Sequence, residues 1–163
     1  MQGSTYTSRP ISASEIPIED VSRVDIEFEQ VDDSGASFEG RVFLNNPQAD
    51  ENTEPNPENG YAGSFYVFGH GGCFGDEGHC EVDAELERAH DPYDPRRSHP
   101  RLPVDKAVEA TEAVRRTASE GGDITVTVVP VITGLTEQTD TENVFKHDLR
   151  PRIVAYELET ETA

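Results

Sequence analysis

The chain has 163 residues, which suits one domain with a single hydrophobic core. Thirteen basic against 33 acidic side chains give a net charge of −20, and because this charge repels phosphate, we expect no nucleic acid partner. The sequence shows no apolar run long enough to cross a membrane and no basic and apolar start typical of a signal peptide. We therefore expect a cytoplasmic protein that does not associate with membranes.

The acidic residues are spread along the whole chain, and only Lys106 and Lys146 are lysines. This pattern resembles the acidic, lysine-poor proteins of salt-loving microbes, so we interpret the charge as a solvated halophilic surface. Excess negative charges repel one another less when salt screens them. We predict that the melting temperature rises from low to molar salt in a thermal denaturation series. A melting temperature that stays flat or falls would contradict this interpretation.

The first stretch, residues 1–20, is rich in Ser, Thr, Pro and Glu and has few bulky apolar side chains. It predicts a flexible N-terminal arm, followed by a single domain over residues 21–160. Two further polar, proline-containing stretches, 45–60 and 90–103, predict long surface loops within that domain.

The domain begins with alternating residues: Val24, Ile26 and Phe28 are separated by acidic side chains, the period of a half-buried strand. A turn signal at 32–35 precedes a second predicted strand, Phe38 to Leu44. Together these segments predict a β-hairpin with a long loop.

The next predicted strand covers residues 63–69 and is apolar on both faces, as in a strand buried between two layers. A segment that contains both cysteines and two of the five histidines follows directly. A rigid strand ahead of such a segment is well suited to hold a site in place.

The Cys/His segment, residues 70–80, contains His70, Cys73, His79 and Cys80 among four glycines. Thiolate sulfur and neutral imidazole nitrogen are ligands that suit copper(I) or zinc. The spacing is not that of a zinc finger, and adjacent ligands such as His79 and Cys80 serve one ion only if the backbone turns between them. Two alternatives stay open: a Cys73–Cys80 disulfide that closes a short loop, and two reduced thiols without a metal.

The last third predicts one helix and two strands. Apolar or small residues recur at helical spacing over 104–118 and indicate an amphipathic helix of about four turns, with Gly121 and Gly122 ending it. Residues 124–132 alternate as a strand that Pro130 interrupts, so a bulge or an edge position is expected, and 153–158 predict a final strand. The fold class is mainly β: an antiparallel β-sandwich or barrel with one amphipathic helix and long loops.

The order of three motifs resembles a known family, the C-terminal β-domain that follows the di-copper domain of tyrosinases and polyphenol oxidases. The motifs are Phe-Glu-Gly-Arg-Val-Phe-Leu-Asn at 38–45, Tyr-Ala-Gly-Ser-Phe at 61–65 and Ile-Thr-Val-Thr-Val-Val-Pro at 124–130. A Gly-His pair at 69–70 and the predicted helix lie between the last two. The likeness covers residues 23–158, and the Cys/His segment is more similar to bacterial or archaeal tyrosinase-associated sequences than to the plant form.

The resemblance implies a non-catalytic accessory that docks on, shields or loads copper into a separate di-copper oxidase domain. A di-copper site of this family takes three imidazoles for each of two copper ions, more than the five histidines of this chain supply. The expected cofactor is copper, with zinc as the alternative, held by His70, Cys73, His79 and Cys80. The competing hypothesis is a self-sufficient metal-binding or cupredoxin-like redox protein that uses the same segment.

Overall fold

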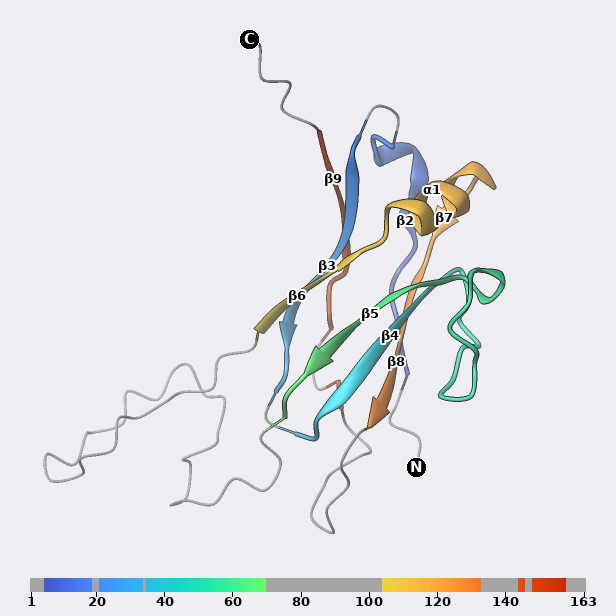
Figure 1. Cartoon of the computed structure of the whole chain (residues 1–163). Coiled ribbons are helices and arrows are strands. Elements are labelled where there is room, and N and C mark those ends of the chain that lie inside the picture. Colours follow the sequence, from blue (N-terminus) through green and yellow to red (C-terminus); the bar gives the residue numbers. More distant parts are fainter. Residues whose placement is uncertain are drawn as a thin grey trace, which may run out of the picture.

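The structure is a computed structural model that describes residues 5–18, 21–33, 35–69, 104–132, 144–145 and 148–157. Figure 1 shows two packed sheets with one helix at one end. The strands are β1 (Tyr6–Thr7), β2 (Ile11–Ser12), β3 (Arg23–Val31), β4 (Phe38–Leu44), β5 (Tyr61–Val67), β6 (Val104–Glu109), β7 (Asp123–Ile124), β8 (Val126–Ile132) and β9 (Arg152–Tyr156). The helices are α1 (Thr111–Ser119) and two 3-10 turns, η1 (Ala13–Glu15) and η2 (Pro57–Asn59).

The two main sheets are antiparallel and open. One has the strand order β1-β8-β4-β5, the other has the order β6-β3-β9, and β2 pairs separately with β7. The mainly β prediction is confirmed, and of its two forms the sandwich is the one observed, since neither sheet closes on itself. Within the described residues, no helix combines the length and the apolar character that a membrane crossing requires.

The core lies between the two sheets because each strand places every second side chain inward. Phe28 from β3, Phe38 and Val42 from β4 and Val128 from β8 are at most 2% exposed. The ring of Phe65 from β5 lies 5.0 Å from that of Phe28, centroid to centroid. Val24, Ile26 and Phe28, which the alternation had assigned to one face, are all fully buried, as predicted.

The predicted hairpin of the first two long strands is wrong. β3 pairs with β6 and β9, whereas β4 pairs with β5 and β8 in the other sheet. The connection between β3 and β4 therefore crosses from one sheet to the other. The physical reason is that both strands carry strongly apolar inward faces, which are buried better by facing each other across the core than by lying side by side.

The predicted helix over 104–118 is wrong in its first half. Val104–Glu109 forms β6, and α1 covers only Thr111–Ser119. Val104, Lys106 and Val108 also fit a two-residue period, and pairing with the edge of β3 satisfies their backbone groups. The remaining helix is amphipathic as predicted, with Val114 fully buried against the sandwich.

The expected N-terminal arm differs from the structure over its described residues, 5–18. β1 adds to the edge of β8 and β2 pairs with β7. Ile16 is only 7% exposed and belongs to the main core cluster. Few but well-spaced isoleucines thus attach a polar stretch to the domain.

The predicted bulge or edge position of the strand that contains Pro130 is wrong, because β8 lies between β1 and β4 and its pairing with β4 has no register shift. Pro130 lies opposite Gly40 of β4. On its other side, the described pairing with β1 ends at Tyr6, opposite Val128. The Val126 carbonyl accepts a hydrogen bond from the Ser8 backbone N–H, so the backbone groups of Val126 point toward β1. Every second residue of a strand repeats this direction, so the backbone groups of residues 128 and 130 point to the same side. The missing N–H of Pro130 therefore points away from β4 and costs no bond between β8 and β4.

Candidate functional site

The predicted metal ligands, His70, Cys73, His79 and Cys80, lie outside the described residues, as do the other three histidines of the chain. The structure does describe the residues from which the Cys/His segment starts. These are the last residues of β5 and the two that follow, Phe68 and Gly69. The described part of the candidate site is therefore the scaffold that leads into this segment.

One end of the sandwich, which we call the loop end, gathers the ends of five strands. In one sheet, Phe38 at the start of β4 lies opposite Val67 of β5 and Ile132 of β8. In the other sheet, Val31 of β3 pairs with Val104 of β6. Residues on both sides of the 70–103 stretch, and the residue before the 133–143 stretch, thus lie at the same end (Figure 1).

The chain enters the Cys/His segment through a close contact with the connection between β3 and β4. The Gly69 backbone N–H donates a hydrogen bond to Ser37 Oγ at 3.0 Å. A Cβ atom at Gly69 would overlap the carbonyl group of Ala36, closer than such atoms approach in proteins. Only glycine therefore fits here, and Ala36 is itself buried, with 7% exposure. Sequence reasoning missed Ser37 and Gly69 as candidate site residues.

The prediction that residues 63–69 are buried on both faces is wrong. Phe65 and Val67 point into the core, while Tyr66 is 61% and Phe68 is 85% exposed. The reason is that β5 is an edge strand whose second face lies on the outside of the sandwich. Two aromatic side chains therefore lie exposed at the loop end, directly before the Cys/His segment.

The charges on the outer face of the three-stranded sheet are paired. Arg23 binds Asp25 through two hydrogen bonds of 2.7 Å, and Arg152 lies within 3.2 Å of Glu27. The Tyr156 hydroxyl donates to Glu27 at 2.8 Å, which raises the pKa of this tyrosine. Among the described residues, no group of three or more His, Cys, Asp or Glu side chains is arranged to hold a metal ion. The described part of this surface thus offers no metal site.

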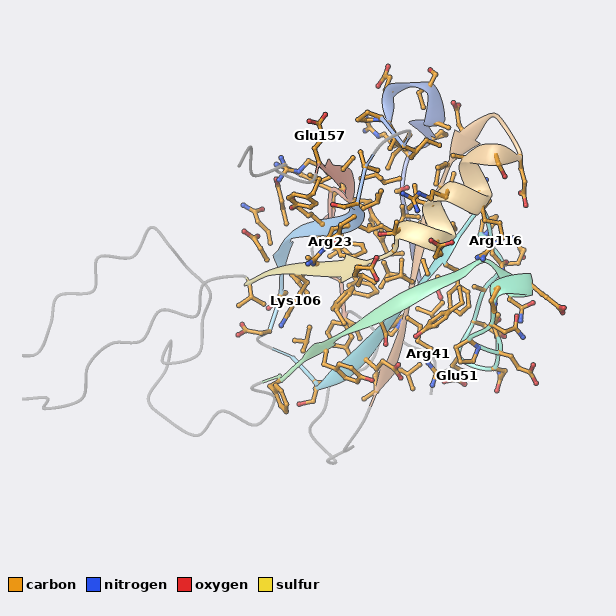
Figure 2. All side chains as sticks on the ribbon, turned by 45° about the horizontal axis from the view of Figure 1, so that its top comes forward. Arg23, Arg41, Glu51, Lys106, Arg116 and Glu157 are labelled. Atoms are coloured by element: carbon orange, nitrogen blue, oxygen red, sulfur yellow. The ribbon has the colours of Figure 1, made fainter. Side chains whose placement is uncertain are left out.

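A hollow of about 240 Å³ lies between the 45–60 loop and α1. Arg116 extends from α1 beside this loop (Figure 2), and Glu58 and Glu120 also line the hollow. Its other described lining residues include Asn45 and Asn59, whose side chains hydrogen-bond the backbone of Asp123 and Glu54. Asn59 therefore braces the loop internally, and Asn45 ties the start of the loop to β7.

A hydrogen-bond network that is buried at Thr111 and exposed at Glu109 joins β3, β6 and α1 at the other end of the sandwich. The Thr111 hydroxyl accepts from the backbone N–H of Val24 at 2.9 Å and donates to the Glu109 carboxylate. The backbone N–H of Thr111 also donates to Glu109, and these bonds lower the pKa of the Glu109 carboxyl. These bonds connect Glu109, the last residue of β6, to Thr111, the first residue of α1.

We expect Thr111→Val to destabilise the fold by about 1–3 kcal/mol, because the Val24 N–H stays buried and loses its acceptor. Thr5→Val is the matched control, since Thr5 is exposed just before β1 and should change stability by less than about 0.5 kcal/mol. Urea denaturation of both variants measures the difference. Equal stability of the two variants would show that the network contributes nothing.

Comparison with known proteins returned no match: no family model, no curated protein and no solved structure is similar to the chain. The site therefore rests on the chain's own residues and on their arrangement in the structure.

Proposed function

We propose that this chain is a non-catalytic accessory domain of a tyrosinase-type oxidase. It would dock on, shield or load copper into a separate di-copper catalytic domain in the cytoplasm. One observation carries the proposal. The three motifs that resemble the tyrosinase C-terminal domain, at 38–45, 61–65 and 124–130, lie in β4, β5 and the β7–β8 stretch, and β8, β4 and β5 are hydrogen-bonded neighbours in one sheet. This arrangement supports the proposal because the three motifs belong to one structural unit.

The metal-binding part of the proposal rests on the Cys/His segment. Two thiolates and two imidazoles favour copper(I) or zinc, and the segment starts from the loop end of that same sheet. A domain that holds copper(I) by Cys73 and Cys80 with His70 or His79 can supply the ion to an empty oxidase site. The exposed side chains of Tyr66 and Phe68, which directly precede the segment in the sequence, offer apolar contact area to a partner.

A second candidate function is a self-sufficient redox protein of the cupredoxin type. The β-sandwich favours it, since such a scaffold can hold a Cys and His copper site on its loops. The only methionine of the chain is Met1, so an axial ligand of another kind would be required. One tightly bound copper with an intense thiolate charge-transfer colour would favour this function, whereas colourless copper(I) or zinc favours the accessory.

The decisive experiment uses a tyrosinase-type di-copper domain from the same genome, prepared without copper. Catechol oxidation is measured after addition of the copper(I)-loaded chain, the metal-free chain, or an equal amount of free copper(I). We expect the loaded chain to restore activity faster than free copper, or the chain to lower the activity of the copper-filled domain by covering its site. If the loaded chain activates the copper-free domain no faster than free copper, and the chain leaves the activity of the copper-filled domain unchanged, the accessory function is wrong.

A further inference from the structure

We propose that Asn59 is a spontaneous modification site, at which opening of the 45–60 loop permits deamidation and deamidation in turn loosens the loop. Asn59 is followed by Gly60, and glycine has no side chain to keep its backbone nitrogen away from the asparagine carboxamide. The contacts of the folded loop hold this reaction back. The modification therefore occurs when the loop opens.

The loop requires both residues of this Asn-Gly pair. Gly60 has a φ of 80°, and a Cβ there would overlap the Leu44 carbonyl oxygen, so only glycine fits. The Asn59 side chain donates a hydrogen bond to the Glu54 carbonyl at 3.0 Å, which closes the loop on itself. A chemically labile pair is thus built into the turn before β5.

Deamidation of Asn59 proceeds through a cyclic imide. The Gly60 backbone nitrogen loses its proton to water or hydroxide and attacks the side-chain carbonyl carbon of Asn59. A C–N bond forms, and the side-chain nitrogen takes up a proton and leaves as ammonia. Water then opens the imide at one of its two carbonyls. The product is aspartate, or isoaspartate with an added methylene group in the main chain, and either one carries a new negative charge.

Hydrogen bonds in the folded loop oppose this ring closure. The Gly60 N–H donates to the Pro57 carbonyl at 3.1 Å, so the attacking nitrogen is already engaged. The Asn59 carboxamide is held by the Glu54 carbonyl, and the Asn59 backbone N–H donates to Asn56 Oδ1 at 3.0 Å. Ring closure requires these bonds to open, so its rate should follow the population of the open loop.

The folded loop also covers apolar side chains. Phe43, Val129 and the loop residue Ala49 form a second cluster with Tyr61, apart from the main core. Phe43 and Val129 are at most 2% exposed, and the rings of Phe43 and Tyr61 lie 5.6 Å apart. Opening of the loop would therefore expose apolar surface, which keeps the open population small.

The product of deamidation weakens the contact that closes the loop. A carboxylate at position 59 has no proton to donate to the Glu54 carbonyl oxygen, so an attraction becomes a repulsion. In isoaspartate the added methylene also displaces Gly60, whose carbonyl accepts from the Leu44 N–H at 2.8 Å. Each deamidated chain thus keeps a looser loop, and the change runs in one direction.

The first test follows deamidation of the full chain in mildly alkaline buffer by ammonia release, mass and peptide mapping. Asn56→Ala removes the acceptor of the Asn59 N–H and should speed the reaction at Asn59 about 2- to 30-fold, through the lost turn cap. Asn52→Ala is the matched control in the same loop, because the Asn52 side chain is exposed, and it should keep the wild-type rate. The wild-type chain in guanidinium chloride should react faster than the folded chain.

Two results would overturn control of the reaction by the loop. One is deamidation at Asn59 in the folded wild type that is as fast as in the unfolded chain. The other is a rate in Asn56→Ala equal to that in Asn52→Ala.

The second test uses Asn59→Asp, which reproduces the aspartate product. The Leu44 N–H, bonded to the Gly60 carbonyl, should exchange with deuterium about 5- to 150-fold faster in this variant than in the wild type. Asn52→Asp adds the same charge to the loop and should leave this exchange unchanged. Equal exchange in the two variants would overturn the loosening of the loop by deamidation.

Discussion

Replacing Cys73 and Cys80 together by serine should abolish the metal binding that we propose for the Cys/His segment. The wild-type protein, reduced and dialysed, should retain about one copper(I) or zinc ion per chain, because thiolates supply most of the binding free energy of such sites, on the order of 10 kcal/mol or more. A serine hydroxyl is not a ligand for soft metals, so the double variant should retain less than about a tenth of an ion. Elemental analysis together with thiol counting measures both quantities.

The matched control replaces His90 and His99, which lie in sequence well beyond the Cys/His segment. This control should keep the wild-type metal content. A freshly reduced and dialysed wild-type chain that has lost both thiols to a disulfide and holds no copper or zinc would contradict the metal site and favour the Cys73–Cys80 bridge.

Phe28→Ala should destabilise the sandwich by about 3–5 kcal/mol, because it removes a fully buried ring from the layer between the two sheets. The ring of Phe65 loses its partner at 5.0 Å, and a cavity remains that the two sheets cannot close without shifting. For a domain of this size the loss corresponds to a melting temperature lower by about 6–20 °C. Thermal and urea denaturation at molar salt measure it.

Phe68→Ala is the control for the same chemical change at an exposed position. Phe68 is 85% exposed, so its replacement should alter stability by less than about 0.5 kcal/mol. If the two phenylalanine variants were equally stable, the division of residues between core and surface in this fold would be wrong.

The sequence was sufficient to predict the strands whose inward and outward residues differ sharply. Val24, Ile26 and Phe28 alternate with acidic side chains, and all three are buried in β3. The partner of that strand was not predictable in the same way, because alternation identifies the buried face of a strand and not its neighbour. In the structure β3 pairs with β6 and β9, although β4 is the strand that follows it in the chain.

The error over 104–109 has a different cause. Val104, Ala107 and Val108 fit the helical spacing, while Val104, Lys106 and Val108 fit a strand. A segment as short as β6 is too brief for periodicity to separate the two. Hydrogen bonding to the edge of β3 selects the strand, and β3 lies far away in the sequence.

The scaffold of the candidate site was only partly accessible from the sequence. The strand before the Cys/His segment was predicted, and the exposure of Tyr66 and Phe68 was missed because apolar residues on both faces resemble a buried strand. The contact between Ser37 and Gly69 requires the register of β4 against β5, in which Phe38 lies opposite Val67. Given that register, counting two residues onward would have placed Gly69 beside Ala36.

The most direct test of the accessory function is catechol turnover by this chain alone, with and without added copper. Oxidation in the tyrosinase family requires two copper ions that dioxygen can bridge, and the five histidines of this chain cannot supply three imidazoles to each ion. A non-catalytic accessory should show no turnover above that of the same concentration of free copper. Copper-dependent turnover by the chain alone, clearly above that of free copper, would contradict the accessory function and show that the chain is an enzyme in its own right.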